Sequence, residues 1–313
     1  MTVDPQAQAI LSMFAAIPQP DFATLQATDY RAMIAQQKLP PSNEPVAQIA
    51  DRLIDGPGGP LALRLYHPRP GQILPAIVFF HGGGWVDGDL ESHDNFCRRL
   101  ANLSGYAVLA VDYRLAPEAP FPAALDDARA ALQWLHAHAK ECQVDPDRLA
   151  VCGDSAGGNL AIACTLMARD PAQNLPRISH QLLFYPVIDA ACDTPSFDSY
   201  ANGYLLSRDM MQWFWQQYLK DPADRQDDHA NPAQAGDLAG LPSATIVTAQ
   251  CDPLADEGAA YAKRLQQAGV PVEFKCWEGV FHGFASMTGM MQAADDALAL
   301  GAGAVRQALR QQG

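Results

Sequence analysis

Short apolar runs alternate with helix-like stretches along most of the chain, from about residue 75 onward. A strand that is buried on both faces is apolar at nearly every position, so this alternation is typical of a parallel sheet whose strands are joined by crossover helices. The predicted strands lie near residues 47–54, 61–67, 76–80, 106–111, 148–153, 180–186, 244–250 and 271–277. The clearest predicted helices lie near residues 91–103, 122–141, 156–169, 256–268 and 290–311. The pattern therefore predicts an α/β fold.

Two segments of the chain depart from this alternation, and an edge hairpin precedes the alternating part. The Gly/Pro-rich link at residues 55–60 predicts an antiparallel hairpin of the first two strands at one edge of the sheet. Residues 1–45 are rich in Ala and Gln and interrupted by prolines, and residues 190–222 contain a helix-like run at 209–219 that is apolar on nearly every side. Ser207 is a plausible N-cap of that helix. Two interpretations stay open: a buried core helix, or a cap that this helix and the N-terminal segment form over a substrate pocket.

Composition narrows the possible partners. The 313 residues show no break in composition and no internal repeat, which favours one large domain with an ample core. The net charge of -14 and the pI near 4.8 disfavour binding to nucleic acid and to anionic membrane surfaces. No segment approaches the roughly 20 apolar residues of a membrane span, and residues 1–30 lack the apolar core of a secretory signal. We expect neither membrane nor nucleic-acid partners.

The cysteines bear on compartment and on metals. The chain has seven of them, an odd number, with no Cys-x-x-Cys and no Cys/His ligand spacing. Reduced thiols in a cytoplasmic protein fit this pattern better than disulfides, and the spacing argues against a zinc site. Cys152 and Cys276 fall inside predicted strands and are interpreted as core residues. The sequence thus predicts a cytoplasmic protein that needs neither a metal ion nor another cofactor.

The strongest chemical signal is the sequence Gly-Asp-Ser-Ala-Gly at residues 153–157, between an apolar strand and a helix. A serine on such a strand-to-helix turn is held in a strained conformation with its hydroxyl exposed above the sheet. The flanking glycines leave room, because a Cβ at residue 153 or 157 would crowd the neighbouring strand or helix. The motif by itself is only suggestive, since roughly one chain of this length in ten contains it by chance. Its setting predicts that Ser155 is a nucleophile.

Three further motifs supply the other parts of an acyl-transfer site. His-Gly-Gly-Gly-Trp at residues 81–85 follows an apolar strand, Asp252 closes another, and His282 lies just past the last one. The order glycine loop, serine, aspartate, histidine is that of α/β-hydrolases. We predict that His282 is the base, that Asp252 orients it, and that three N–H groups bind the oxyanion. Those three donors belong to Gly83, Gly84 and Ala156.

Other acids and histidines have alternative interpretations. Asp256 and Glu257 could replace Asp252, although they fit better as acids that favour the positive end of the next helix. Asp154 adjoins the nucleophile but is not expected to reach the catalytic imidazole. His81 is interpreted as a structural residue that holds the glycine loop. Surface or core roles are expected for the remaining histidines, which are His67, His93, His136, His138, His180 and His229.

Together these motifs resemble the hormone-sensitive-lipase-like family of carboxylesterases, bacterial family IV, within the α/β-hydrolases. Further blocks carry the resemblance: Asp-Tyr-Arg-Leu-Ala-Pro-Glu at residues 112–118, Asp-Pro-Leu at 252–254 with Asp-Glu-Gly at 256–258, and His-Gly-Phe at 282–284. The resemblance covers most of the chain and implies a mostly parallel eight-stranded sheet, flanked by helices and covered by a helical cap. The expected boundaries are residues 1–45 and 190–222 for the cap, and 46–189 and 223–313 for the hydrolase core.

The resulting prediction is a serine carboxylesterase that hydrolyses short- to medium-chain esters through an acyl-enzyme. Its expected partners are a small-molecule ester and, in a homo-oligomer, further copies of the chain. The residues predicted to bind the substrate are Trp85, Met210, Met211 and Phe214. Two rivals are weighed against it. A ligand-binding receptor on this fold would lack a catalytic residue, whereas an amide or lactone hydrolase would use the same residues.

Overall fold

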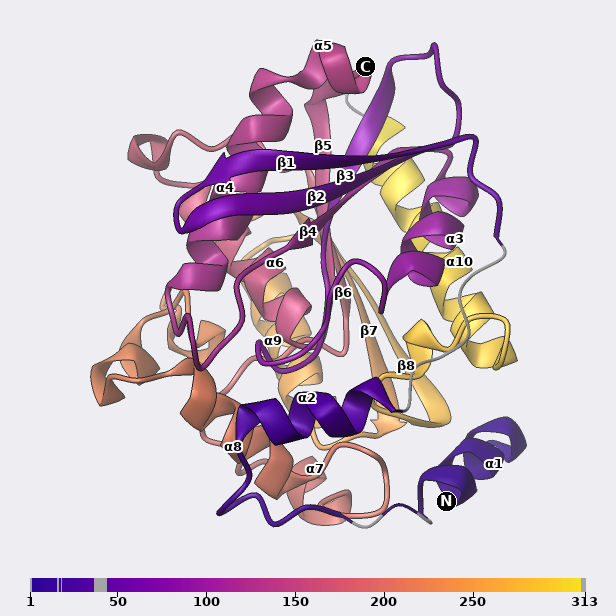
Figure 1. The fold of residues 1–313 in the computed structure, drawn as a ribbon, viewed down its shortest axis with the longest axis vertical. Coiled ribbons are helices and arrows are strands. Elements are labelled where there is room, and N and C mark those ends of the chain that lie inside the picture. The colour runs from indigo at the N-terminus through magenta and orange to yellow at the C-terminus, as the bar shows by residue number, and fades with distance from the viewer. Residues whose placement is uncertain (1, 16, 18, 37–43, 311–313) are drawn as a thin grey trace.

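A single eight-stranded sheet forms the centre of the computed structural model, which describes residues 2–15, 17, 19–36 and 44–310 (Figure 1). The strand order is β1-β2-β4-β3-β5-β6-β7-β8, in which β1, β2 and β4 pair antiparallel and all the other neighbours pair parallel. The strands are β1 (Gln48–Gly56), β2 (Gly59–His67), β3 (Leu74–Phe80), β4 (Ala107–Asp112), β5 (Val144–Asp154), β6 (His180–Phe184), β7 (Ser243–Cys251) and β8 (Val272–Phe281). The predicted α/β fold and its edge hairpin are confirmed.

Helices cover both faces of the sheet (Figure 1). On one face lie α4 (Ala123–Ala137), α5 (Ala139–Cys142), α6 (Ala156–Met167) and α9 (Ala255–Gln267), and on the other lie α3 (Asp94–Ser104) and α10 (Gln292–Arg310). Strand β3 shows why both faces need a cover, since Val78 and Phe80 join the core on one face while Ile77 and Phe79 join the core on the other. Alternate side chains of a strand point to opposite faces, so an all-apolar strand must be buried on both.

The observed elements follow the predicted ones, with three differences in extent. The helix predicted over residues 122–141 is interrupted at His138, which ends α4 with non-helical dihedral angles. Strand β5 begins earlier than predicted because Val144 pairs with Leu74 of β3. Strand β8 runs on to Phe281, because a register shift after Ala249 lets it keep pairing with β7. Each difference arises from contacts between strands or at a helix end, which a local apolar pattern does not encode.

The two segments outside the alternation pack against each other at the carboxyl end of the parallel strands (Figure 1). The N-terminal segment forms α1 (Pro5–Phe14) and α2 (Ala27–Ala35), and the later one forms α7 (Pro195–Ser199) and α8 (Arg208–Tyr218). Ser207 caps α8 as predicted, accepting a hydrogen bond of 3.1 Å from the Met210 N–H. The Trp213 indole of α8 donates to the Leu25 carbonyl oxygen at 3.2 Å, and its ring lies 5.2 Å from that of Tyr30 on α2. Residues 1, 16, 18 and 37–43 of the N-terminal segment, and residue 311 of the last predicted helix, lie outside the described residues.

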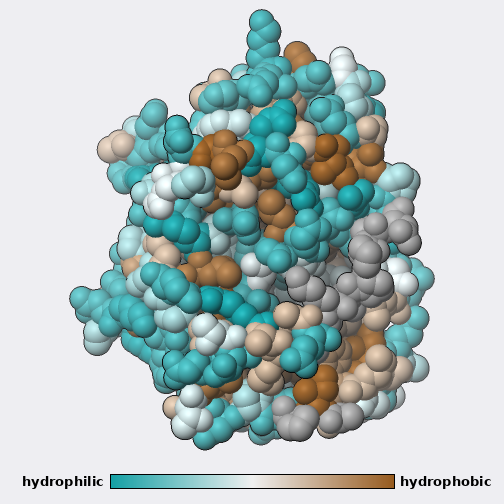
Figure 2. Space-filling model, viewed as in Figure 1, coloured by the Kyte–Doolittle hydropathy of each residue, from teal (hydrophilic) through white to brown (hydrophobic). Residues whose placement is uncertain are grey.

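The remaining elements are short, and the surface is largely polar. The 3-10 helices are η1 (Pro171–Gln173), η2 (Pro222–Gln226), η3 (Pro232–Gln234) and η4 (Phe284–Ser286). The face shown in Figure 2 is mostly hydrophilic, and its hydrophobic residues form small separate groups. In the part of the chain that the structure describes, no helix combines the length and the apolar composition that crossing a bilayer requires. All seven cysteines are free thiols.

Candidate active site

Ser155 sits on the sharp turn between β5 and α6. Its backbone has φ 54° and ψ -119°, a conformation that non-glycine residues rarely adopt. The turn is possible because its neighbours have no side chain. A Cβ on Gly153 would lie 2.1 Å from the Gly157 carbonyl oxygen, and a Cβ on Gly157 would lie 1.9 Å from that of Phe80. The turn holds Ser155 at the carboxyl end of the sheet, with 9% of the residue exposed.

The structure brings Ser155 together with the two other predicted residues of the triad. The Nε2 atom of His282 lies 2.9 Å from the Ser155 hydroxyl oxygen, and its Nδ1 atom lies 2.8 Å from Oδ2 of Asp252. Asp252 follows β7, His282 follows β8, and the Asp252 carboxylate is fully buried. Because the carboxylate accepts the proton of Nδ1, the imidazole presents an unprotonated Nε2 to the serine hydroxyl. This arrangement suits proton transfer from Ser155 to His282.

The two acids that could have replaced Asp252 have other partners. Asp256 accepts the backbone N–H of Ser196 at 2.8 Å, and Glu257 accepts the backbone N–H of Ile188 at 2.7 Å.

Sequence reasoning missed Tyr185, whose ring packs against the His282 imidazole with centroids 4.7 Å apart. Tyr185 directly follows β6, at the edge of the sheet where Ser155, Asp252 and His282 also lie. Its position after a parallel strand could have indicated that it lies in the active site.

The glycine loop after β3 lies beside Ser155. Gly83 and Gly84 both have positive φ, 112° and 61°, and the N–H groups of Val86 and Asp87 each donate to the Gly83 carbonyl oxygen at 3.0 Å. Across the described residues, no hydrogen-bond acceptor is found for the N–H groups of Gly83 and Gly84. Ala156 is the first residue of α6, so its N–H has no carbonyl of an earlier helical turn to donate to. These groups could donate to an oxygen that develops negative charge near Ser155.

Residues 77–286 match the model of a family described as having the alpha/beta hydrolase fold. The chain belongs to the α/β-hydrolases. Two curated relatives are an ethyl acetate hydrolase of Pseudomonas putida, 43% identical with 80% of each chain covered, and the carboxylesterase NlhH of Mycobacterium tuberculosis, 40% identical with 89% of this chain and 88% of that one covered.

Solved structures of α/β-hydrolases agree with this assignment. A hyperthermophilic esterase from the archaeon Pyrobaculum calidifontis superposes with a TM-score of 0.90 at 38% sequence identity, covering 98% of this chain and 99% of that one. The resemblance to hormone-sensitive-lipase-like carboxylesterases predicted from the motifs is therefore confirmed.

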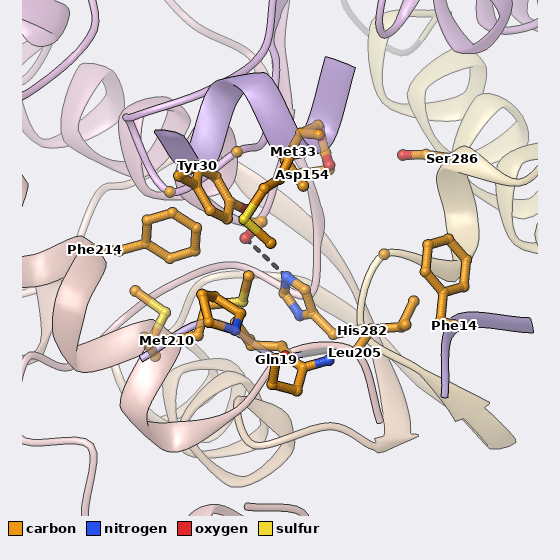
Figure 3. A pocket seen from close by; sticks show the side chains of 18 of the residues that line it. Phe14, Gln19, Tyr30, Met33, Asp154, Leu205, Met210, Phe214, His282 and Ser286 are labelled. Atoms are coloured by element: carbon orange, nitrogen blue, oxygen red, sulfur yellow. Dashed lines mark hydrogen bonds between the residues drawn. The ribbon is translucent and has the colours of Figure 1, made fainter. Parts of the chain in front are cut away.

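A cavity of about 330 Å³ opens onto Ser155 and His282 of this α/β-hydrolase. Both cap segments contribute to its wall, and Figure 3 shows Tyr30, Met33, Met210 and Phe214 around the imidazole, with a dashed line for its bond to Ser155. The lining residues are Phe14, Ile17, Gln19, Pro20, Tyr30, Met33, Ile34, Gly83, Gly84, His93, Asp154, Ser155, Leu205, Leu206, Met210, Met211, Phe214, His282, Gly283 and Ser286. An apolar wall with a few polar groups at one end is typical of a pocket for an apolar ligand.

Three of the four predicted substrate-binding residues line this cavity, and Trp85 does not. The Trp85 side chain is fully buried, stacked on Tyr218 at 4.2 Å between ring centroids and against Trp215 at 4.7 Å. Its positive φ of 60° turns the side chain away from the loop and into the core under α8. The prediction that Trp85 binds substrate is corrected accordingly: it supports the glycine loop and α8 from behind.

His93 was expected to have a surface or core role, yet its imidazole lines the cavity together with Asp154. It stands at the N-terminus of α3, the helix that follows the glycine loop. The start of that helix lies at the edge of the sheet where the carboxyl ends of the strands meet, so its position was a usable signal. His81 has the expected structural place, buried with Nδ1 at 2.7 Å from the Gly82 carbonyl oxygen.

Outside the cavity, the described residues include one group that could offer three ligand atoms to a metal ion. It consists of Asp227, Asp228 and His229, whose ligand atoms lie within 4.8 Å of one another. The His229 and Asp228 side chains are 35% and 40% exposed, and none of the three residues lines the cavity. Exposed clusters of acidic residues are common on protein surfaces. The cluster of Asp227, Asp228 and His229 is not part of the hydrolase site.

Glu257 is a buried acid of this α/β-hydrolase that takes no part in the triad. One carboxyl oxygen accepts the Ile188 N–H and the other is buried, with no hydrogen-bond partner among the described residues. Burial raises the pKa of Glu257 well above its usual value, and the nearby carboxylates of Asp189 and Asp252 raise it further. Burial therefore favours the neutral, protonated carboxyl group in the folded protein.

Glu257→Gln should become more stable relative to the wild type as the pH rises. Between the unfolded pKa of about 4.3 and the raised folded pKa, the unfolded Glu257 is ionised while the folded one keeps its proton, so wild-type stability falls with pH. Glutamine has no proton to lose, and the difference in unfolding free energy should grow by as much as about 1.4 kcal/mol per pH unit in the range between these two pKa values. Urea unfolding at several pH values measures it. A difference that stays constant with pH would contradict a neutral Glu257.

Proposed function

We propose that this chain hydrolyses short- to medium-chain carboxylic esters through an acyl-enzyme on Ser155. It is a carboxylic ester hydrolase, since relatives 40% and 43% identical over most of the chain are named as carboxylesterase and ethyl acetate hydrolase. The observation that carries the mechanism is the unbroken path of hydrogen bonds from the Ser155 hydroxyl through His282 to Asp252. A nucleophile, a base and a group that orients the base are the parts that acyl transfer requires.

The first half-reaction forms the acyl-enzyme. The Ser155 oxygen attacks the ester carbonyl carbon while Nε2 of His282 takes the hydroxyl proton. The imidazolium then gives that proton to the leaving alcohol, and the bond between the carbonyl carbon and the alcohol oxygen breaks. In the second half-reaction Nε2 of His282 takes a proton from water while the water oxygen attacks the acyl carbon. The imidazolium then returns that proton to the Ser155 oxygen as the bond between this oxygen and the acyl carbon breaks, which releases the acid. The buried Asp252 carboxylate stabilises the imidazolium in both halves.

The oxyanion of each tetrahedral intermediate would be bound by the N–H groups of Gly83, Gly84 and Ala156. Their backbone positions beside Ser155 support this role, since peptide N–H groups in a dry site stabilise developing negative charge without having to reorganise. One such donor contributes on the order of 3 kcal/mol to lowering the barrier.

The segments 1–45 and 190–222 would form the cap over the acyl pocket. Met210, Met211 and Phe214 from α8 and Tyr30, Met33 and Ile34 from α2 line the cavity, which supports this division of the chain. A closed apolar pocket gains about 0.8 kcal/mol for each substrate CH₂ that it buries and loses affinity once the chain no longer fits. The name of the ethyl acetate hydrolase supports short esters as substrates.

Catalytic efficiency should rise from acetyl esters to an optimum between butanoyl and octanoyl esters and fall for palmitoyl esters. Met210→Ala and Phe214→Ala should move that optimum to longer chains or flatten it, because both side chains line the cavity. The matched control is Met13→Ala, since Met13 belongs to the same proposed cap but is 70% exposed and does not line the cavity. A series of p-nitrophenyl esters measures these profiles.

Two outcomes of this series would overturn the acyl-pocket assignment. Palmitoyl turnover equal to or better than butanoyl turnover would favour a lipase. A profile that Met210→Ala and Phe214→Ala leave unchanged would mean that α8 does not limit the pocket. Comparing p-nitrophenyl butanoate with the matching anilide also separates an esterase from an amidase, which would cleave both.

The cytoplasm as the location of the protein and its assembly into a homo-oligomer stay predictions from the sequence.

A further inference from the structure

A buried pair of ionisable side chains beside the active site has no part in the mechanism above. Asp154 precedes the nucleophile and His93 begins α3, and both line the cavity. The Nε2 atom of His93 lies 3.2 Å from Oδ1 and 3.4 Å from Oδ2 of Asp154. The two side chains are 13% and 6% exposed. A buried acid is costly unless it is paired, so this contact calls for a functional or structural reason.

The hydrogen bonds around His93 can all be formed with protons on both ring nitrogens. The Ser92 hydroxyl gives its single proton to the Asp89 carbonyl oxygen at 2.8 Å, so towards Nδ1 of His93, 3.0 Å away, it can only accept. In that arrangement Nδ1 donates. Nε2 faces a carboxylate that offers only acceptors, so it donates too. His93 is thus an imidazolium paired with the Asp154 carboxylate.

The electrostatic surroundings agree with this protonation. Burial opposes the charged form of His93, but the carboxylate of Asp154 outweighs it and raises the pKa of His93. Burial likewise opposes the charge on Asp154, and the His93 imidazolium outweighs it and lowers the pKa of Asp154. The other titratable groups facing His93 are Asp87, Asp89 and His81, all from the loop after β3.

His81 differs from His93 in charge. Burial, with the nearby positive charge of His93, lowers the pKa of His81 to about 4. The ring of His81 is therefore neutral, and it stacks on that of Tyr113 at 4.2 Å between centroids. A neutral His81 can donate from Nδ1 to the Gly82 carbonyl oxygen, 2.7 Å away.

The pair and His81 hold the two adjacent peptide units on either side of Gly82. Oδ1 of Asp154 accepts the Gly82 N–H at 2.8 Å, and His81 donates to the Gly82 carbonyl oxygen. That carbonyl shares its planar peptide group with the Gly83 N–H, so fixing the oxygen also fixes the direction of the N–H. The Gly83 N–H is one of the proposed oxyanion donors. The Asp154 carboxylate thus acts on the loop one residue before this donor.

Charge gives the pair a second effect. Asp154 is bonded to Ser155 in the chain and lines the same cavity, so an unpaired carboxylate there would repel the negative charge that develops on the substrate oxygen. We propose that the His93 imidazolium and the Asp154 carboxylate act together as positioning residues, holding the oxyanion loop through the Gly82 N–H while His93 cancels the carboxylate charge. This inference rests on the proposed oxyanion hole.

The test is a double-mutant cycle of His93→Gln and Asp154→Asn. His93→Gln should lower kcat for p-nitrophenyl butanoate by about 10- to 100-fold with KM within about threefold, because the buried Asp154 charge is left uncancelled. Adding Asp154→Asn should recover part of that loss, because asparagine removes the charge while keeping the shape of the Asp154 side chain and an oxygen for the Gly82 N–H. The double variant should therefore be more active than His93→Gln alone.

The pH profile gives a second readout. His93 keeps its charge below its raised pKa and loses it as the pH rises through that value, together with the stability that the pair contributes. The kcat of the wild type should thus decline on the alkaline side, and the double variant, with no group to titrate, should lack that decline. The matched control is His180→Gln, since His180 is also buried but binds Ser243 and Thr245 and does not line the cavity. It should keep the wild-type profile.

Three results would overturn this inference: a double variant no more active than His93→Gln, a loss confined to KM, or an alkaline decline that survives in the double variant. If His93→Gln does not fold, the double variant still tests the proposal. Its kcat should then stay within the range expected for a loop without the buried charge, and its pH profile should lack the alkaline decline. Labelling of Ser155 by a phosphonate separates this result from the proposed function. All these variants should still be labelled at Ser155, and failure of labelling in the wild type would instead refute the acyl-enzyme itself.

Discussion

Replacing Ser155 with alanine should lower kcat/KM for p-nitrophenyl butanoate by about 10⁴-fold or more. The hydroxyl lies 2.9 Å from Nε2 of His282, and no other group on this path can attack the ester carbonyl. Alanine removes the covalent route while the apolar cavity wall stays in place, so substrate should still bind. Steady-state kinetics with rigorously purified protein measures the loss, and equilibrium binding of a slow ester measures what remains of the affinity.

Ser286→Ala is the matched control for this substitution. Ser286 also lines the cavity, but among the described residues it forms no hydrogen bond with His282, so its removal should change kcat/KM by less than about threefold. Thermal unfolding of both variants shows whether either has lost the fold. A Ser155→Ala protein that keeps a tenth of wild-type activity would exclude Ser155 as the nucleophile.

Gly83→Ala should lower kcat by about 10²- to 10³-fold, the effect expected when an oxyanion donor is lost. Gly83 has φ 112°, where side chains are strained, and an added Cβ would lie 2.1 Å from the Asp87 carbonyl oxygen. That atom belongs to the backbone of the same turn, so the clash cannot be relieved by rotating a side chain. The loop must move, and the N–H groups of Gly83 and Gly84 must move with it. Inhibition by a boronic acid, which mimics the tetrahedral intermediate, should weaken in parallel with kcat.

A second glycine separates crowding from backbone strain. Gly71 also has a positive φ, 89°, but a Cβ there would meet no atom within 4 Å. Gly71→Ala should cost some stability through strain and leave kcat unchanged. If Gly83→Ala kept kcat within about threefold of the wild type, the N–H groups of this loop could not be the oxyanion donors.

Much of the fold and the place of the catalytic triad follow from local sequence patterns. Buried parallel strands are apolar throughout, so their positions are visible in the sequence, and the motif residues at their carboxyl ends meet because those ends share one edge of the sheet. Ser155, Asp252 and His282 were placed in this way. The places of His93 and Trp85 could not be predicted in this way, because their surroundings depend on tertiary contacts. The side chain of Trp85 turns into the core through a backbone angle that no pattern encodes, and His93 takes its role from Asp154, which is 61 residues away.

The helix α8 shows a different limit. Its apolar sequence allowed a buried core helix or a wall of the pocket, and the structure combines both. Trp215 and Tyr218 pack with Trp85 in the core, whereas Met210 and Phe214 on another side of the helix line the cavity. A helix that is apolar all round has to be covered on all sides, but its sequence does not say which side faces protein and which faces a cavity.

The most direct test of the central claim is to treat the wild-type protein with an alkyl p-nitrophenyl phosphonate and locate the adduct by peptide mass spectrometry. The hydrogen-bonded path through Ser155, His282 and Asp252 predicts one adduct per chain, on Ser155, formed at the rate at which esterase activity is lost. The Ser155→Ala protein should take up no label. An adduct on another residue, or full loss of activity with Ser155 unmodified, would contradict the assignment of this site.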